Sequence, residues 1–458
     1  MLPGDLGDAL GFDLSHVWHP MTQHSAFLDR PPLLITGGEG ARVIDARGRR
    51  YLDAMAGLWC VNIGYGRREV AEAVYRQMIS LAYYPHLQAN APAAALAKRL
   101  SDLTGGEFGR TYFVNSGTEA VEAAMKIALQ YHRLTRPGEA RYKFIGRHLS
   151  YHGMSMAALG LGGIPERKVM FEPLAGAFVK APIASPYRCW FCRGECTLAC
   201  ADYVEFLIRT EDPRTVAAVV VEPVQSAAGV LVPPPGYLQR LSDVCKKYGV
   251  LLIVDEVITG FGRTGKWFAY QHEGVAPDIM CVAKGLSSGY QPIGATLVRE
   301  EIFQAFLSGP GKPGSPQTGR ELMQVNTWGG HAAACAGALA NLDIMEREGL
   351  VDRSARMGAY LLDRLRAALD HPVVGNVRGR GLMIAVELVR DKSTKEPLDG
   401  ERMARVLSGC LERGVIVGRS AGTGAGLGNC VVLSPPLVLS ESDADEIVDA
   451  LAASIGSL

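Results

Sequence analysis

The sequence predicts an α/β protein with a large domain, built on a mostly parallel β-sheet, and a smaller α+β domain. Short β-rich runs alternate with helical patterns through the middle of the chain, which is typical of parallel strands joined by crossover helices. The two ends of the chain mix short extended pieces with long helical patterns instead. The length of 458 residues also indicates about two or three structural units rather than one small domain.

The middle of the chain supplies the strands and helices of the large domain. Helical patterns cover Glu119 to Tyr131 and Gly236 to Tyr248. The second pattern ends on Lys246 and Lys247 before Gly249, a stop signal with cations at the negative end of the helix. The expected strands are Arg110 to Val114, Lys143 to Ile145, Val216 to Glu222, Val250 to Asp255, Ile279 to Ala283 and Ala295 to Val298.

Both ends of the chain contribute to the predicted small domain. We expect it to comprise residues 1–58 and 336–458, with residues 59–335 forming the large domain. Residues 310–319 are rich in Pro, Gly and Ser and predict an exposed loop. The extended pieces at the two ends are Leu33 to Ile35, Arg42 to Ile44, Tyr51 to Asp53, Gly381 to Glu387 and Val415 to Val417.

Composition excludes several classes of partner. Lys plus Arg equals Asp plus Glu, at 47 each, so no basic excess indicates nucleic acid or an anionic membrane. The first residues do not resemble a signal peptide, and the apolar runs are too short to span a bilayer. Ten cysteines in a chain of this length do not indicate a secreted disulfide framework. A reducing cytoplasm is therefore the expected location.

The first functional motif follows the strand that ends at Val114. Asn115-Ser116-Gly117-Thr118-Glu119-Ala120 leads directly into an apolar-periodic helix. Backbone N–H groups, the hydroxyls of Ser116 and Thr118 and the positive end of the helix can together hold a phosphate. An ordinary Ser or Thr N-cap explains the same residues when they are considered alone.

Two further strand ends carry an acid and a lysine. A continuous apolar strand ends at Asp255, and ligands of open α/β sheets lie outside the carboxyl ends of the strands. Lys284 directly follows another apolar strand, where burial lowers the pKa of an amine and frees it for Schiff-base chemistry. An acid that binds magnesium or caps a helix, and a solvated loop lysine, are the alternatives. The three motifs together supply what pyridoxal 5′-phosphate (PLP) needs: an anion cradle, an acid for the pyridine nitrogen and an amine for the aldehyde.

At these residues the sequence resembles the class III (ω-) aminotransferases, which are PLP-dependent enzymes of fold type I. Within that family it is most similar to the taurine–pyruvate and ω-amino acid–pyruvate aminotransferases, through Val17-Trp18-His19-Pro20 and the segment from Ala54 to Asn62. The segments that carry the family resemblance are residues 115–120, Tyr151-His152-Gly153, Glu222-Pro223-Val224-Gln225, residues 255–265, Ala283-Lys284-Gly285 and residues 326–330.

The resemblance implies a role for each matched residue. Lys284 is expected to bind the cofactor as an internal aldimine and then to move the proton between the substrate carbon and C4′. Asp255 is expected to pair with the pyridine nitrogen, and Tyr151 and Val257 to press on the two ring faces. The phosphate is expected on Ser116, Gly117 and Thr118, with Thr327 reaching the phosphate of the neighbouring subunit of a homodimer. Gln225 is expected near the 3′ oxygen, Glu222 near the substrate, and His152 among the cofactor contacts, although packing explains a histidine there equally well.

The substrate side of the site depends on residues outside these motifs. Trp59 and Arg419 are the expected substrate-binding residues, with Arg419 recognising the carboxylate of the keto acid and Arg380 as the alternative. The resemblance implies ping-pong transfer from an ω-amino acid, a taurine-like donor or a primary amine to a keto acid, expected to be pyruvate. A 2-oxoglutarate-dependent enzyme, or a class III racemase, mutase or decarboxylase, would share the cofactor residues.

A cluster of four cysteines offers a different class of function. Cys189, Cys192, Cys196 and Cys200 follow one another as C-x2-C-x3-C-x3-C, which could ligate zinc or an iron–sulfur cluster. Structural zinc sites usually have two well-separated pairs of ligands, so reduced structural cysteines are the expected state and no metal is predicted. A metal-dependent redox protein and a regulatory protein without turnover are the remaining alternatives.

Overall fold

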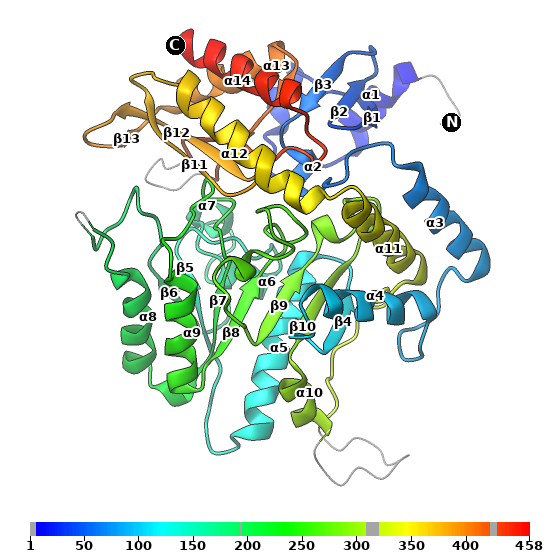
Figure 1. Cartoon of the computed structure of the whole chain (residues 1–458), viewed down its shortest axis with the longest axis vertical. Helices are drawn as coiled ribbons and strands as arrows, with labels where there is room; N and C mark the ends of the chain where they lie inside the picture. The colour runs from blue at the N-terminus through cyan, green and yellow to red at the C-terminus, as the bar shows by residue number, and fades with distance from the viewer. Residues whose placement is uncertain (1–5, 193–194, 308–319, 422–427) are drawn as a thin grey trace.

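The computed structural model describes residues 6–192, 195–307, 320–421 and 428–458. Two thirds of the way down the molecule in Figure 1 lies a seven-stranded sheet, with helices on both sides. The loop predicted at residues 310–319 lies outside the described residues. The strand order of the sheet is β4 (Arg110–Val114), β10 (Gly294–Val298), β9 (Ile279–Val282), β8 (Leu251–Asp255), β7 (Val216–Val221), β5 (Lys143–Arg147) and β6 (Phe178–Ala181).

The six strands predicted for the large domain are all present in this sheet. Only β10 runs antiparallel to its neighbours, so the sheet is mostly parallel, as predicted. The inner strands are buried on both faces because alternate residues enter two different cores. In β7, Ala218 and Val220 pack with α5 (Gly117–Thr135), whereas Val219 and Val221 join the larger core on the other face.

Helices cover both faces of the large sheet and account for the helical patterns of the sequence. The helix predicted from Glu119 is α5 (Gly117–Thr135), and the one predicted from Gly236 is α9 (Tyr237–Tyr248), which ends on Gly249 at φ 62°. The other elements of this region are α2 (Ala56–Trp59), α3 (Arg68–Ser80), α4 (Ala91–Leu103), α6 (Met156–Leu161), α7 (Pro165–Lys168), α8 (Ala199–Thr210), α10 (Glu300–Leu307) and α11 (Ala332–Arg347).

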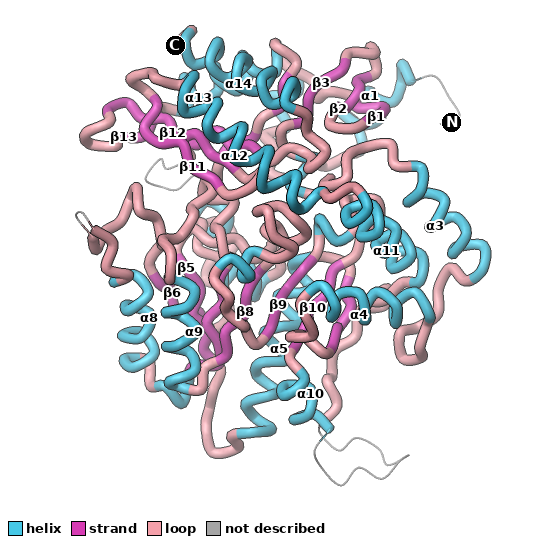
Figure 2. The backbone as a smooth tube through the Cα atoms, in the orientation of Figure 1, coloured by secondary structure: helices cyan, strands magenta, loops and turns pink. Residues whose placement is uncertain are grey.

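Two smaller sheets contain the ends of the chain, and Figure 2 shows them as the upper magenta strands. One sheet pairs the N-terminal β3 in parallel with the C-terminal β14, so the two ends form one unit. The proposed boundary at residue 335 falls inside α11, and the exact domain limits remain a prediction. The elements are α1 (Leu6–His16), β1 (Ile35–Glu39), β2 (Arg42–Asp45), β3 (Arg50–Asp53), α12 (Leu350–Ala368), β11 (Val374–Gly379), β12 (Ile384–Asp391), β13 (Glu396–Pro397), α13 (Gly400–Glu412), β14 (Val415–Ile416), β15 (Gly418–Arg419), β16 (Cys430–Leu433) and α14 (Glu441–Gly456).

Three of the expected terminal strands have different bounds. The strand predicted at Leu33 to Ile35 begins only at Ile35, because its partners in β2 start opposite that residue. The strand predicted from Gly381 begins at Ile384, because Gly381 turns at φ 57° against the backbone of Thr264. The strand predicted at Val415 to Val417 divides between two sheets after Ile416.

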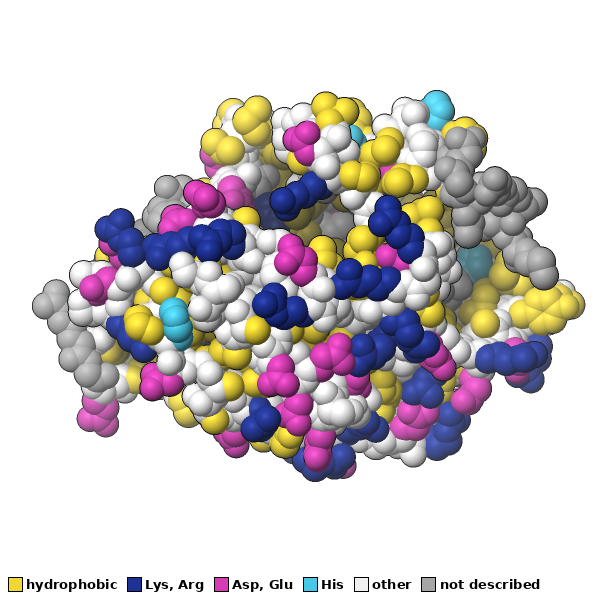
Figure 3. Space-filling model, turned by 90° about the horizontal axis from the view of Figure 1, so that it is seen from above, with side chains coloured by type: hydrophobic (Ala, Val, Ile, Leu, Met, Phe, Trp, Pro, Cys, Tyr) yellow, Lys and Arg dark blue, Asp and Glu magenta, His cyan; other side chains and the backbone are white. Residues whose placement is uncertain are grey.

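The charges on the surface agree with the equal numbers of basic and acidic residues in the sequence. Basic and acidic side chains occur together on the face seen from above in Figure 3. No helix in the described part of the chain is long and apolar enough to cross a membrane.

Candidate active site

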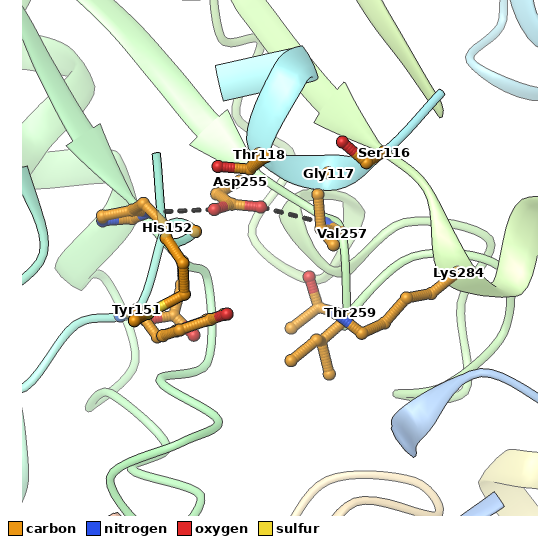
Figure 4. A pocket seen from close by; sticks show the side chains of 13 residues that line it. Ser116, Gly117, Thr118, Tyr151, His152, Asp255, Val257, Thr259 and Lys284 are labelled. Atoms are coloured by element: carbon orange, nitrogen blue, oxygen red, sulfur yellow. Dashed lines mark hydrogen bonds and ion pairs between the residues drawn. The ribbon is translucent and has the colours of Figure 1, made fainter. Parts of the chain in front are cut away.

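The three motifs of the sequence meet at one edge of the large sheet. Strands β4, β9 and β8 point the same way, so their carboxyl ends share that edge. Ser116 and Lys284 each lie two residues beyond a strand, and Asp255 is the last residue of β8. A pocket lies between them, and Figure 4 shows Lys284 entering from the side opposite Tyr151 and His152. The pocket is lined by Ser116, Gly117, Thr118, Tyr151, His152, Gly153, Met154, Glu222, Asp255, Val257, Ile258, Thr259 and Lys284.

The N-terminus of α5 forms one wall of the pocket. Ser116 is its N-cap, and the Ser116 Oγ accepts from the N–H of Glu119 at 3.3 Å. The N–H groups of Gly117 and Thr118 have no acceptor in the described part of the chain. A Cβ on Gly117 would lie 2.7 Å from the Cγ1 of Val257, so glycine is needed for this close approach. The N-cap interpretation is therefore confirmed. It leaves the phosphate-binding prediction open, because free amides remain at the positive end of the helix.

Asp255 forms a buried polar pair with His152. The Nδ1 of His152 lies 2.8 Å from Asp255 Oδ2, while Asp255 Oδ1 accepts from the N–H of Val257 at 3.1 Å. His152 is 2% exposed, and its Nε2 has no partner among the described residues. Through this contact, His152 orients the carboxylate that faces the pocket.

Lys284 lies directly beyond β9 in the left-handed region, at φ 42°. Burial lowers the pKa of its amine, although Cys60, Asp255 and Glu222 nearby act in the opposite direction. Its Nζ donates no hydrogen bond to any other residue that the structure describes. An amine with a depressed pKa and a free nitrogen in a pocket is suited to nucleophilic and proton-transfer chemistry.

Glu222 holds the loop that bears Tyr151. Its Oε1 accepts from the N–H of Tyr151 at 3.1 Å, and its Oε2 accepts from the N–H and Oγ of Ser226 at 3.0 and 2.7 Å. Burial raises the pKa of Tyr151, which keeps its phenol neutral at ordinary pH. The carboxylate of Glu222 thus fixes one wall of the pocket.

Four of the predicted site residues do not line this pocket in the single chain. Gln225 is fully buried, and it donates to the carbonyl of His148 at 2.9 Å while its Oε1 has no described partner. Thr327 is exposed on the loop before α11, and Trp59 is buried in a neighbouring apolar cluster. The exposed Arg419 donates from Nε to the carbonyl of Gly428 at 2.6 Å.

The alternative Arg380 also lies outside the pocket. Burial lowers the pKa of its guanidinium, and the nearby carboxylate of Glu273 raises it. Glu273 follows the 3-10 helix Ala269–His272, and neither Arg380 nor Glu273 lines the pocket.

Sequence reasoning missed two polar residues that follow Asp255 in the chain, Glu256 and Thr259. Thr259 lines the pocket and donates to Oε2 of Glu256, and Glu256 Oε1 also accepts from the N–H of Tyr270 at 2.7 Å. Burial raises the pKa of Glu256 to about 7. Both residues stand in the segment 255–265 that carries the resemblance, which was the only signal for them.

Cys189, Cys192 and Cys196 precede α8, Cys200 lies in its first turn, and all four thiols are free. The N–H of Cys192 donates to Cys189 Sγ at 3.3 Å. Hydrogen bonds from Thr197 lower the pKa of the Cys192 thiol to about 7. Within residues 6–192, 195–307, 320–421 and 428–458, no group of three or more His, Cys, Asp or Glu is placed to hold a metal ion.

Three features of the pocket lining, and one buried group outside that lining, fit PLP. The free amides of Gly117 and Thr118 suit a phosphate, and Asp255 suits a protonated pyridine nitrogen. Lys284 offers an amine without a partner, and Gln225 Oε1 is a buried acceptor without a donor. These are the groups that the cofactor would satisfy.

Comparison with known proteins agrees with this assignment. The sequence model of the family described as "Aminotransferase class-III" matches residues 25–455. The chain is 46% identical over 437 residues to the uncharacterised aminotransferase YhxA of Bacillus subtilis, covering 95% of this chain and 94% of that one. It is 39% identical to the taurine–pyruvate aminotransferase of Bilophila wadsworthia, covering 97% and 96%. A solved Bacillus anthracis aminotransferase superposes with a TM-score of 0.94 at 41% identity, covering 100% of both chains.

Fold, pocket and matches together define a PLP-dependent enzyme of fold type I. More specifically, the chain belongs to the class III aminotransferases.

Proposed function

We propose that this aminotransferase moves an amino group from an ω-amino acid, a taurine-like donor or a primary amine to pyruvate, in two half-reactions at one site. The observation that carries the proposal is the meeting of Lys284, Asp255 and the N-terminus of α5 in one pocket. The donor and acceptor are supported by similarity to the taurine–pyruvate aminotransferase of Bilophila wadsworthia.

Each pocket residue has a separate task in this proposal. Bound PLP supplies an electron sink for the substrate carbon that loses its proton. Lys284 would remove and return that proton, because burial lowers the pKa of its amine and its nitrogen faces the pocket. Asp255 keeps the pyridine nitrogen protonated, and His152 orients Asp255 through the 2.8 Å contact. Tyr151 and Val257 confine the ring and exclude water from its faces.

The remaining predicted residues act around these groups. Ser116, Gly117 and Thr118 would hold the phosphate, and the unpartnered Gln225 Oε1 would accept a hydrogen bond from the cofactor. Glu222 keeps the Tyr151 loop in place beside the pocket. Trp59 and Arg419 shape the substrate side, with Arg419 moving from Gly428 to bind the carboxylate of the keto acid.

We also propose that two chains share their sites, with Thr327 reaching the phosphate bound by its partner. Thr327 is exposed and outside its own pocket, and its carbonyl accepts from Tyr83 Oη at 2.9 Å. Large apolar side chains are exposed beside it, including Val325 at 78% and Trp328 at 61%. Contiguous exposed apolar surface of this kind is typical of a protein interface.

Mixed dimers test this sharing directly. A Lys284→Ala chain and a Thr327→Ala chain are each expected to be impaired alone. If Thr327 acts across the interface, a mixed dimer of the two contains one site with both wild-type residues and recovers close to half the wild-type activity. If Thr327 acts within its own chain, no intact site forms and activity stays low. A chain carrying both substitutions, mixed with wild type, is the control, and light scattering reports the dimer.

The substrate assignment is tested with a matrix of donors and acceptors. Taurine, β-alanine, 4-aminobutyrate, putrescine and a benzylic amine are each tried with pyruvate and with 2-oxoglutarate, and transfer is read from the absorbance of the bound cofactor. We expect pyruvate to be the better acceptor. A strong preference for 2-oxoglutarate would contradict the acceptor, and racemisation without transfer would indicate one of the other class III reactions.

A further inference from the structure

Two buried aspartates in the N-terminal sheet organise their turns in the same way. Asp45 ends β2 and accepts from the N–H of Arg47 and of Arg49, each at 2.9 Å, and from Tyr51 Oη at 3.0 Å. Asp53 ends β3 and accepts from the N–H groups two and four residues later, and it too accepts from a tyrosine hydroxyl. Its donors are Met55 N at 2.9 Å, Gly57 N at 2.6 Å and Tyr65 Oη at 2.5 Å.

The backbone that follows the two aspartates is different. After Asp45 the only left-handed residue of the turn is Gly48, which adopts φ 79° without a steric penalty. After Asp53, Ala56, Gly57 and Trp59 are all left-handed, at φ 49°, 65° and 62°. Ala56 and Trp59 each have a Cβ, so this conformation costs roughly 1–2 kcal/mol per residue. The turn therefore persists only because the surrounding contacts hold it.

The turn places two side chains next to residues that line the pocket. Trp59 is 8% exposed and packs with Val224, Met383 and Val432, and pocket-lining Ile258 packs against the same cluster. Cys60 lies close enough to Lys284 for each to influence the other's pKa.

The same turn also touches the strand that carries Arg419. A Cβ on Gly418 would lie 2.4 Å from the Sδ of Met55, so Met55 packs directly on this strand. The N–H of Ala54 donates to the carbonyl of Ile416 at 2.9 Å, and Ser434 Oγ donates to the carbonyl of Met55 at 3.2 Å. A shift of the turn would therefore move both proposed substrate-binding residues.

We propose that Asp53 and Tyr65 are positioning residues that set the selectivity of the enzyme for its amine donor, by holding the 55–60 turn and with it Trp59. The selectivity part rests on the proposed function, in which Trp59 borders the substrate. Asp53 is 3% exposed and relies on three donors, so losing one leaves part of a buried carboxylate unsatisfied. Once these hydrogen bonds to Asp53 weaken, Ala56 and Trp59 relax towards right-handed backbone. Trp59 and the pocket-lining Ile258 that packs with it then shift.

The experiment compares Tyr65→Phe and Asp53→Asn with the matched variants Tyr51→Phe and Asp45→Asn. The first readout is acrylamide quenching of Trp59 in the cofactor-free protein, taken as the difference from the same variant carrying Trp59→Phe. The second is the ratio of kcat/KM for a small donor to that for a bulky one. Tyr65→Phe is expected to increase the quenching of Trp59 and to change the donor ratio by about 5–10-fold, the size of effect typical of altered pocket fit. Tyr51→Phe is expected to lower the melting temperature and leave both readouts unchanged.

Each outcome decides the proposal. If Tyr65→Phe and Tyr51→Phe give the same Trp59 quenching and the same donor ratio, the proposal is wrong and the Tyr65–Asp53 contact is structural only. If Asp53→Asn does not fold, Tyr65→Phe alone decides, because it removes a single hydroxyl. If the wild-type enzyme transfers no amine to any acceptor, the proposed function fails, while quenching of Trp59 still decides whether Asp53 and Tyr65 position the turn.

Discussion

The two sides of the pocket are built from different kinds of structure. On the cofactor side, Ser116, Asp255 and Lys284 follow the ends of buried strands in one sheet. On the proposed substrate side, Trp59 lies on a left-handed turn and Arg419 on a two-residue strand of the smaller unit. On the cofactor side, the backbone of the sheet fixes the positions of Ser116, Asp255 and Lys284. The second side depends on contacts between distant segments, so it can differ among enzymes that share the first.

The largest expected effect tests the cofactor side. Lys284→Ala should lower kcat by about 10⁴-fold or more, because it removes both the amine and the proton-transfer group. Circular dichroism should stay unchanged, since Nζ makes no described hydrogen bond.

Lys180 provides a matched control for that substitution. It lies at a strand end in β6, where burial lowers its pKa to about 7, and it donates to the carbonyls of Gly160 and Leu161 at 2.7 and 2.5 Å. Lys180→Met should therefore reduce stability and keep kcat. Near-normal turnover of Lys284→Ala would refute the assignment of the cofactor lysine.

The second prediction distinguishes the roles of the two adjacent acids Asp255 and Glu256. Asp255→Asn should lower kcat by about 10²-fold, since a charge-assisted hydrogen bond contributes roughly 3 kcal/mol. It should also change the visible spectrum of the bound cofactor. Glu256→Gln is the control, because Glu256 faces Thr259 and Tyr270 rather than the pocket. Equal losses in the two variants would mean that Asp255 acts only through the stability of the fold.

The difference between the two sides also explains what the sequence could predict. A strand followed by Asp255 or Lys284 is a local pattern, and the parallel sheet then brings such ends together without further information. The contacts that hold the turn bearing Trp59 are not local in sequence. Asp53 accepts a hydrogen bond from Tyr65, and the turn is hydrogen-bonded to Ile416 and Ser434. Only the three-dimensional structure identifies them.

The resemblance to the family supplied the remaining site residues without their geometry. It named Gln225, Trp59 and Arg419, but it could not place them, and none of the three lines the pocket of the single chain. It also could not say that His152 pairs with Asp255, because a contact across 103 residues leaves no trace in the local pattern.

The substrate side is tested by the two candidate arginines. Arg419→Ala should raise the KM for the keto acid by about 10–100-fold, the range expected when a charge-assisted contact worth 1.5–3 kcal/mol is lost. The half-reaction with a primary amine that has no acidic group should keep its rate, because such a donor needs no partner at Arg419. Arg380→Ala is the parallel variant, and an effect on KM there but not in Arg419→Ala would exchange the two roles.

The smallest effect concerns the buried support of the cofactor side. Burial raises the pKa of Glu256 to about 7 from 4.5, so the folded protein keeps the proton over a range in which the unfolded chain has lost it. The stability due to this group is thus fully present below pH 4.5 and is lost as the pH rises through 7, by roughly 3 kcal/mol at most. Glu256→Gln cannot titrate, and it also alters the hydrogen bonds of Thr259 and Tyr270 by an amount that does not depend on pH. The melting temperature of wild type relative to Glu256→Gln should therefore fall as the pH rises from 4.5 to 7, whatever their offset. Parallel curves would mean that Glu256 is ionised in the fold, because its hydrogen bonds from Thr259 and Tyr270 outweigh the effect of burial.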